Sequence, residues 1–215
     1  MIGRRISERL ASHYHLVGLD LKPPEESESK CYFIKCDFTD DRSVEEAFTA
    51  IRERFGSRLA SVVHLAAYYD FNGAESPLYN QLTVEGTRRL CRALTDFDDV
   101  GQLVFSSSLL VMKPCELGEK LNELSPTRAE WAYPKSKLAA EKVIDEEASS
   151  ISTVILRLAG VYDEDGHSLP ICQNIRRIAE REFESYLFPG DAERGQAFVH
   201  LDDVGRCFEL VVERR

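Results

Sequence analysis

Residues 61–65 read SVVHL and residues 103–105 read LVF, two short runs with little alternation between apolar and polar side chains. A strand with one face in water alternates between the two kinds, whereas a strand that is covered on both faces does not. We therefore expect helices to cover both faces of these strands. This arrangement is typical of a parallel sheet between two helical layers.

Similar apolar runs recur along the chain and alternate with longer stretches of helical spacing. We expect strands over residues 15–20, 31–36, 61–65, 102–106 and 152–156. We expect helices over residues 4–14, 43–55, 78–95, 128–148 and 202–213. Since crossovers between parallel strands are right-handed almost without exception, this alternation predicts a doubly wound, Rossmann-type α/β sheet with helices on both faces.

The 215 residues are enough for one domain with a small lobe. We expect a single dinucleotide-binding domain over residues 1–215. After residue 158 the alternation loosens, so residues 159–201 are expected to contribute to a partial C-terminal substrate lobe. A nucleotide-binding sheet of this class opens with a strand and a glycine-rich turn, but this sequence opens directly on a helix.

Composition narrows the class of protein. Acidic residues outnumber basic ones by 37 to 27, which gives a net charge of −10. The sequence shows no basic patch that could bind phosphate groups, so we expect no nucleic-acid partner. The apolar runs are far shorter than the roughly 20 residues of a membrane span, and the N-terminus lacks a signal-peptide pattern, so we expect a cytoplasmic protein. The six cysteines form no C-x-x-C pair and no cluster with histidine, which predicts reduced thiols and no metal site.

Tyr133 and Lys137 are four residues apart within a predicted helix and therefore share one of its faces. An ammonium beside a phenol favours the phenolate and lowers the tyrosine pKa. Such a phenol is a general acid or base for the interconversion of an alcohol and a ketone. Taken alone the pair is weak, because tyrosine and lysine meet in this way on many helix surfaces.

Residues 106–108 are three serines that follow a predicted strand. Hydroxyl groups at the carboxyl end of a parallel strand stand at the crevice where ligands bind, so one of them can orient a substrate oxygen beside Tyr133. The alternative is that the serines only cap a turn. Serine, tyrosine and lysine in this order, on a strand and then a helix, are much less expected by chance than either part.

Asp20 ends the strand predicted over residues 15–20, where a carboxylate accepts hydrogen bonds from the ribose hydroxyls of a dinucleotide. It would repel a 2′-phosphate, so it favours NAD over NADP; the alternative is an ordinary loop aspartate. Residues 64–67 read HLAA, and their small side chains allow the backbone to approach a dinucleotide closely. The alternative for His64 is a core histidine.

With these pieces in order, the chain resembles the NAD-dependent epimerase/dehydratase family of the extended short-chain dehydrogenase/reductase superfamily over nearly its whole length. The resemblance rests on ordered motifs as well as on the residues above. Gly3 looks like the last glycine of the G-x-x-G-x-x-G turn, Asp37 and Phe38 like the pair that contacts adenine, residues 64–67 like H-x-A-A, and residues 83–87 like N-V-x-G-T with Thr83 in place of Asn. Residues 157–162 and 198–204 resemble two later landmarks near the substrate lobe.

The resemblance implies an NAD-dependent oxidoreductase or epimerase that acts on a hydroxyl or keto group, with a nucleotide-sugar as one expected substrate. It implies Tyr133 as the acid/base, Lys137 as the residue that holds the nicotinamide ribose, and Ser108 as the residue that orients the substrate. It also places Gly3, Asp20, Asp37, Phe38, Leu65, Ala66 and Ala67 against the cofactor. A homodimer is a further expectation from the family.

Two departures from the family pattern leave alternatives open. The first strand and the first two glycines of the turn are lacking, which predicts an incomplete phosphate cradle and an apolar slot with unpaired backbone groups between two strands. Leu109 and Leu110 follow Ser108 where the dehydratases carry two acidic residues, which argues against dehydration. The alternative readings are a non-catalytic dinucleotide-binding sensor or regulatory protein, and an inactive truncated fragment.

Overall fold

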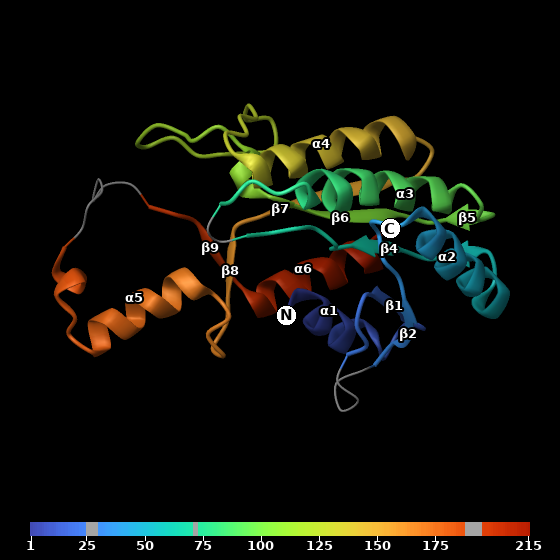
Figure 1. The fold of residues 1–215 in the computed structure, drawn as a ribbon, viewed down its shortest axis with the longest axis horizontal. Helices are drawn as coiled ribbons and strands as arrows, with labels where there is room; N and C mark the ends of the chain where they lie inside the picture. Colours follow the sequence, from blue (N-terminus) through green and yellow to red (C-terminus); the bar gives the residue numbers. More distant parts are fainter. Residues whose placement is uncertain (25–29, 71–72, 188–194) are drawn as a thin grey trace.

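A computed structural model describes residues 1–24, 30–70, 73–187 and 195–215. Strands lie in a central layer with helices on either side of it (Figure 1). Above the strands in this view lie α3 (Glu85–Leu94) and α4 (Ala132–Glu147), and below them lie α1 (Ile2–Leu10) and α6 (Leu201–Glu213). The doubly wound α/β class predicted from the sequence is thereby confirmed.

All strand pairs in the described ranges are parallel. The pairs are β1 (Val17–Asp20) with β2 (Tyr32–Lys35), β3 (Arg58–Leu59) with β5 (Asp99–Val100), β4 (Val62–His64) with β6 (Leu103–Ser108), β6 with β7 (Thr153–Leu158), and β8 (Gly160–Tyr162) with β9 (Phe198–His200). Every residue of β6 is buried, as expected for a strand that is covered on both faces.

Two apolar clusters hold the helices on the strands. Ile6 and Leu10 of α1 meet Val104, Val204 and Phe208 on one face. The other face carries α2 (Asp41–Phe55), α3 and α4, and its cluster includes Phe48, Leu90, Phe105 and Ile144. Val104 and Phe105 are neighbours on β6 and point to opposite faces, so this one strand anchors both layers.

Several helix boundaries differ from the prediction. The helix predicted over residues 78–95 begins as a π-helical segment, η1 (Tyr79–Val84), and continues as α3. The helix predicted over 128–148 begins only at Ala132, because the preceding residues are extended and the N–H of Arg128 donates to the carbonyl of Val111 at 2.9 Å. The helix predicted over 4–14 ends at Leu10 in a turn.

The sequence predicts no helix or strand between residues 158 and 202. The segment after β8 contains α5 (Leu169–Ala179) and the short 3₁₀ helix η3 (Phe183–Tyr186), which lie apart from the layers (Figure 1). Residues 188–194 of the expected substrate lobe lie outside the described residues. In the described part of the chain, no helix is both long and apolar enough to cross a membrane.

The central layer is interrupted. Within the described ranges, β1 has only β2 as a strand partner, and β4 has only β6. The break between β1 and β4 lies where the sequence predicts that a strand is lacking. It lies beside the N-terminal turn of α1, because a Cβ atom on Gly3 would stand 3.5 Å from Leu65, the residue that follows β4.

Candidate active site

The residues singled out from the sequence gather at one edge of the sheet, where the parallel strands have their carboxyl ends. They are Gly3 in α1, Asp20 in β1, Asp37 and Phe38 after β2, Leu65, Ala66 and Ala67 after β4, Ser108 in β6, and Tyr133 and Lys137 in α4. Ligands of open α/β sheets bind at this edge.

Ser108, the last residue of β6, lies close enough to Tyr133, in the first turn of α4, for its side chain to lower the pKa of the Tyr133 phenol. The Ser108 Oγ atom also accepts from the N–H of Leu110 at 3.2 Å and so caps the short helix η2 (Leu109–Val111). The ring of Tyr69 packs edge-on against Tyr133, with 4.7 Å between the ring centroids. Capping, the alternative stated for the serines, therefore occurs at Ser108, while the orientation of a substrate oxygen by this residue stays a prediction.

Burial raises the pKa of Tyr133 to about 12, and the nearby side chain of Ser108 only partly opposes this effect. The sequence had led us to expect a pKa lowered by Lys137. That expectation is wrong for this structure, because the Lys137 Nζ atom donates to the carbonyl of Ser106 at 2.6 Å, and desolvation of the Tyr133 phenol outweighs the other influences on its pKa.

Lys137 is almost completely buried, with 2% of its surface exposed. Its Nζ atom lies 4.9 Å from the centroid of the Phe105 ring, a distance at which the ring face attracts the cation. Burial lowers the pKa of Lys137 to about 8, although Glu141 favours the charged form. The ammonium is thus fixed beneath Ser108 and one helical turn from Tyr133.

A buried ion pair fastens α4 to the strands beneath the site. The Arg157 Nη2 atom lies 2.7 Å from Glu141 Oε2, its Nε atom donates to Oε1 at 3.1 Å, and the hydroxyl of Ser107 also donates to Oε1. We did not predict this network from the sequence. The signal available was the position of Glu141, four residues after Lys137 and therefore on the same face of α4.

His64 is a core histidine. Its Nε2 atom lies 2.9 Å from the hydroxyl of Thr87, and that hydroxyl donates to the carbonyl of Thr83 at 2.6 Å. Since the single hydroxyl hydrogen is used in this way, His64 donates through Nε2. Burial, aided by the charge of Lys137, lowers the pKa of His64 to about 3 and keeps the ring neutral at pH 7.

Thr83, which stands where the family pattern has asparagine, has a structural partner of its own. Its Oγ1 atom accepts from the N–H of Tyr68 at 3.0 Å and so ties the loop after β4 to η1. Threonine can therefore supply one of the backbone contacts expected of asparagine at this position.

The residues expected to contact the cofactor differ in how accessible their side chains are. Asp20 is exposed, and among the described residues its carboxylate accepts a long bond, 3.4 Å, from the N–H of Lys22 alone. The carboxylate of Asp37 is engaged by Thr39, which donates both its N–H and its hydroxyl at 2.8 and 2.7 Å, and these bonds lower the pKa of Asp37. Phe38 is buried in the apolar core.

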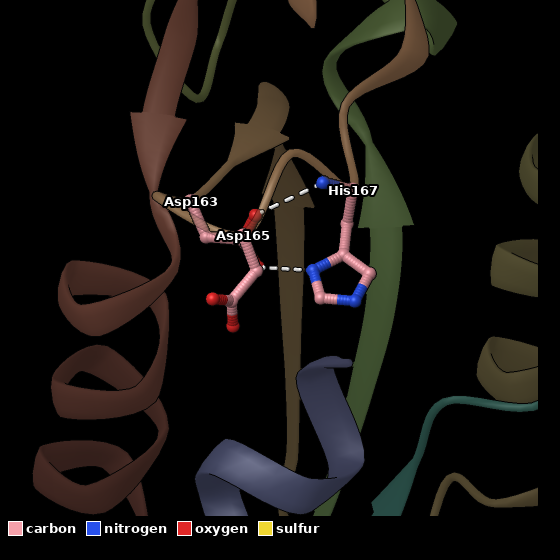
Figure 2. Close-up of side chains that lie close together, drawn as sticks. All are labelled: Asp163, Asp165 and His167. Carbon is pink, nitrogen blue, oxygen red and sulfur yellow. Dashed lines mark hydrogen bonds and ion pairs between the residues drawn. The ribbon is translucent and has the colours of Figure 1, made fainter.

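Three possible metal ligands lie close together in the loop after β8 (Figure 2). Asp163, Asp165 and His167 each place a ligand atom within 4.8 Å of the others. The carboxylate of Asp163 accepts from the backbone N–H of His167 at 3.1 Å and makes a 2.6 Å contact with its Nδ1 atom. Because both oxygens of Asp163 already close the loop, we assign this cluster to loop structure.

Comparison with known proteins agrees with the family resemblance found in the sequence. The model of the NAD dependent epimerase/dehydratase family matches residues 1–215. The NAD complex of UDP-glucose 4-epimerase from Thermus thermophilus is 26% identical, with a TM-score of 0.76 over 99% of this chain and 71% of that chain. No curated protein matches the sequence.

Two further solved structures share the fold at lower identity. One is a protein from Burkholderia cenocepacia that has been assigned as an epimerase. It is 24% identical, with a TM-score of 0.74 over 99% of this chain and 68% of that chain. The Thermotoga maritima UDP-glucose 4-epimerase with UDP-glucose is 21% identical, with a TM-score of 0.76 over 99% of this chain and 70% of that chain.

Proposed function

Because this chain belongs to the NAD-dependent epimerase/dehydratase family, we propose that it is an epimerase or oxidoreductase that acts on a hydroxyl or keto group of a nucleotide-sugar. The observation that carries the proposal is the proximity of the Ser108 and Tyr133 side chains at the carboxyl end of β6, with the buried Lys137 one helical turn further along α4. Similar solved structures that are complexes with UDP-glucose, one of them a UDP-glucose 4-epimerase, support a nucleotide-sugar as the substrate.

In this proposal Tyr133 moves the proton. With a pKa near 12 the phenol is protonated at pH 7 and can donate to a keto oxygen. In the opposite direction the phenolate takes the proton of a substrate hydroxyl. Ser108 orients the same substrate oxygen by hydrogen bonding, and the edge-on ring of Tyr69 restricts where Tyr133 can point.

The donors and acceptors present fit NAD at both ends of the molecule. The exposed carboxylate of Asp20 suits the adenosine ribose, the N-terminal turn of α1 at Gly3 suits the pyrophosphate, and Lys137 suits the nicotinamide ribose. The buried hydroxyl of Tyr79, close to Tyr133, has no hydrogen-bond partner among the described residues, so a bound polar group would satisfy it. NAD would accept and return a hydride at the substrate carbon.

Replacement of Tyr133 by phenylalanine tests the assignment. Loss of the hydroxyl removes the proton transfer and leaves the ring in place, so turnover of UDP-glucose is expected to fall about 10²–10⁴-fold. NAD affinity, measured by calorimetry, should change by less than about fivefold, which corresponds to about 1 kcal/mol.

The control is Tyr32→Phe, at a partly exposed position of β2 away from the site, which should keep full activity. A Tyr133→Phe variant with unchanged turnover would refute the role of Tyr133. NAD binding without turnover by the unaltered protein would instead favour a dinucleotide-binding sensor.

A further inference from the structure

Arg89 of α3 joins three other segments of the chain close to Asp37. Its Nη1 atom donates to the carbonyl oxygens of Phe38 and Gln81 at 3.2 and 3.3 Å, and its Nε atom donates to Asp41 Oδ1 at 2.6 Å. Phe38 lies after β2, Gln81 lies in η1, and Asp41 begins α2. Since only 20% of its side chain is exposed, Arg89 is fixed at the point where these segments meet.

The hydrogen bond from Arg89 to Phe38 affects Asp37 through one peptide unit. The carbonyl of Phe38 and the N–H of Thr39 belong to the same peptide plane, which is rigid. Arg89 donates to the carbonyl, and the N–H donates to Asp37 Oδ1 at 2.8 Å. The direction of the Asp37 carboxylate therefore depends on the orientation of a plane that Arg89 holds.

Packing leaves this peptide little freedom apart from rotation of its plane. The side chain of Phe38 is buried in the core. Gly86, three residues before Arg89 on α3, lies so close that a Cβ atom there would stand 3.2 Å from both the Cβ atom and the carbonyl oxygen of Phe38. The position of Phe38 is thus set by packing, and the hydrogen bond from Arg89 sets the direction of its carbonyl.

The carboxylate of Asp37 keeps one oxygen available. Thr39 donates both its N–H and its hydroxyl to Oδ1, and within the described part of the chain no group donates to Oδ2. The two bonds from Thr39, and to a smaller extent the charge of Arg89, lower the pKa of Asp37, so the carboxylate is ionised at pH 7. Oδ2 is therefore a charged acceptor for an N–H group of a bound molecule.

The ladder between β1 and β2 places this acceptor beside Asp20. Asp20 pairs with Lys35, and the N–H of Cys36 donates to the carbonyl of Asp20 at 3.0 Å, so Asp37 follows at the same edge of the sheet. In the proposed function Asp20 holds the adenosine ribose, to which the adenine base is directly attached. The 6-amino group of adenine is an N–H donor of the kind that Oδ2 requires.

We propose that Arg89 is a positioning residue for the cofactor: through the Phe38–Thr39 peptide it aims the Asp37 carboxylate at the 6-amino group of adenine. This arrangement selects the base, because a 6-oxo group in the same place has no proton to donate and a carboxylate can only accept. The inference rests on the proposed function for the identity of the cofactor.

Calorimetry with two dinucleotides tests the proposal. The probes are NAD and nicotinamide hypoxanthine dinucleotide, in which an oxygen replaces the 6-amino group. The wild type is expected to prefer NAD by about 10–10²-fold, the usual value of a hydrogen bond to a charged group. Arg89→Met removes the donors and keeps most of the aliphatic stem, so this preference should fall at least about fivefold.

The matched control is Arg92→Met on the same helix. The side chain of Arg92 is 69% exposed and its Nε atom lies 3.2 Å from Glu147 Oε2, away from Phe38. This variant should keep the preference of the wild type. Arg89→Lys, which has the charge but not the fork of donors, should retain part of the preference and takes the place of Arg89→Met if circular dichroism shows that the latter does not fold.

Hydrogen exchange measured by NMR on the protein without cofactor tests the link between Arg89 and Asp37 directly. In Arg89→Met the amide of Thr39 is expected to exchange about tenfold faster, because its peptide plane is free to rotate away from Asp37. The amides of β6 should not change. Unaltered exchange at Thr39 would contradict the positioning role.

The binding data separate this role from a structural one and from the proposed function. Equal losses of affinity for both dinucleotides in Arg89→Met, the same change in Arg92→Met, or a wild type without preference would each overturn the role of Arg89. Turnover of UDP-glucose is measured in parallel. A preference for NAD that depends on Arg89, without turnover, would contradict the proposed function alone, and turnover with an unaltered preference in Arg89→Met would contradict the role of Arg89 alone.

Discussion

Lys137 keeps a charge at a depth that water hardly reaches, and three neighbours compensate it: the carbonyl of Ser106 at 2.6 Å, the face of Phe105 and the carboxylate of Glu141. Its pKa falls to about 8 in the folded protein, from an ordinary value of 10.5. The same burial raises the pKa of Tyr133, an acid, to about 12. Desolvation therefore moves both groups of the candidate site towards their neutral forms.

This depressed pKa predicts a pH-dependent stability. Below pH 8 the lysine is protonated in both the folded and the unfolded chain, and the cost of burying the charge is complete. Between pH 8 and 10.5 the unfolded chain binds more protons, so stability should rise with pH. We expect the free energy of unfolding of the wild type, relative to Lys137→Met, to rise by about 2 kcal/mol from pH 7 to pH 10.

The measurement is urea denaturation at each pH, with Lys135→Met, at an exposed position of the same helix, as the matched control. Taking the difference between wild type and variant removes the contributions of Cys36 and Cys91, whose burial raises their pKa to about 11 in both proteins. A difference that stays constant across this range would show that Lys137 is not desolvated.

At the scale of elements, a strand could be predicted where the apolar pattern of its own residues reveals it. The fully buried β6 has apolar side chains on both faces, and its start was predicted within one residue of Leu103. By contrast β8 and β9 have three residues each, and Gly160 pairs with Phe198, so their existence depends on a partner far away in sequence. Such strands carry no periodicity that a local pattern can detect.

The candidate site likewise has residues that a local sequence pattern predicts and properties that depend on contacts between distant segments. Ser108, Tyr133 and Lys137 could be proposed because their order and spacing are local features of a strand and a helix. The ion pair between Glu141 and Arg157 joins α4 to β7, and the pKa of Tyr133 depends on burial by neighbours such as Tyr69. Both properties arise only when distant segments pack together, so the sequence pattern did not reveal them.

A substitution at Gly101 tests how closely the chain before β6 approaches Ala60, which precedes β4. A Cβ atom there would stand 2.6 Å from the carbonyl oxygen of Ala60, a backbone atom that cannot move without shifting β4 against β6. We expect Gly101→Ala to destabilise the protein by about 1–3 kcal/mol, the usual cost of overpacking. The midpoint of urea denaturation measures this change.

The matched control for that substitution is Gly195→Ala, where a Cβ atom would meet nothing within 4 Å. It should leave the midpoint unaltered. Equal midpoints for Gly101→Ala and the wild type would mean that the two strands separate more easily than their close contact implies.

At the scale of the whole molecule, the layered sheet and the segment that follows β8 differ in character. The sheet is held by two apolar clusters, whereas α5 and η3 pack on each other and leave large apolar side chains in solvent. Ile178 is 66% exposed and Phe183 is 73% exposed. We propose that this segment is part of the substrate lobe expected over residues 159–201, and that these side chains are covered when substrate binds.

Hydrogen exchange should therefore separate the two parts of the molecule. Few buried contacts hold α5, so its amides are expected to exchange at least about 10²-fold faster than those of β6, whose opening requires unfolding of the core. Addition of NAD and UDP-glucose together should slow exchange in α5 more than either does alone, because substrate binding would order the lobe. Mass spectrometry of peptides that cover residues 169–187 and 102–108 makes the comparison within one sample. Protection of α5 equal to that of β6 before any addition would show that the segment is already folded onto the sheet, and the proposed closure would have nothing left to order.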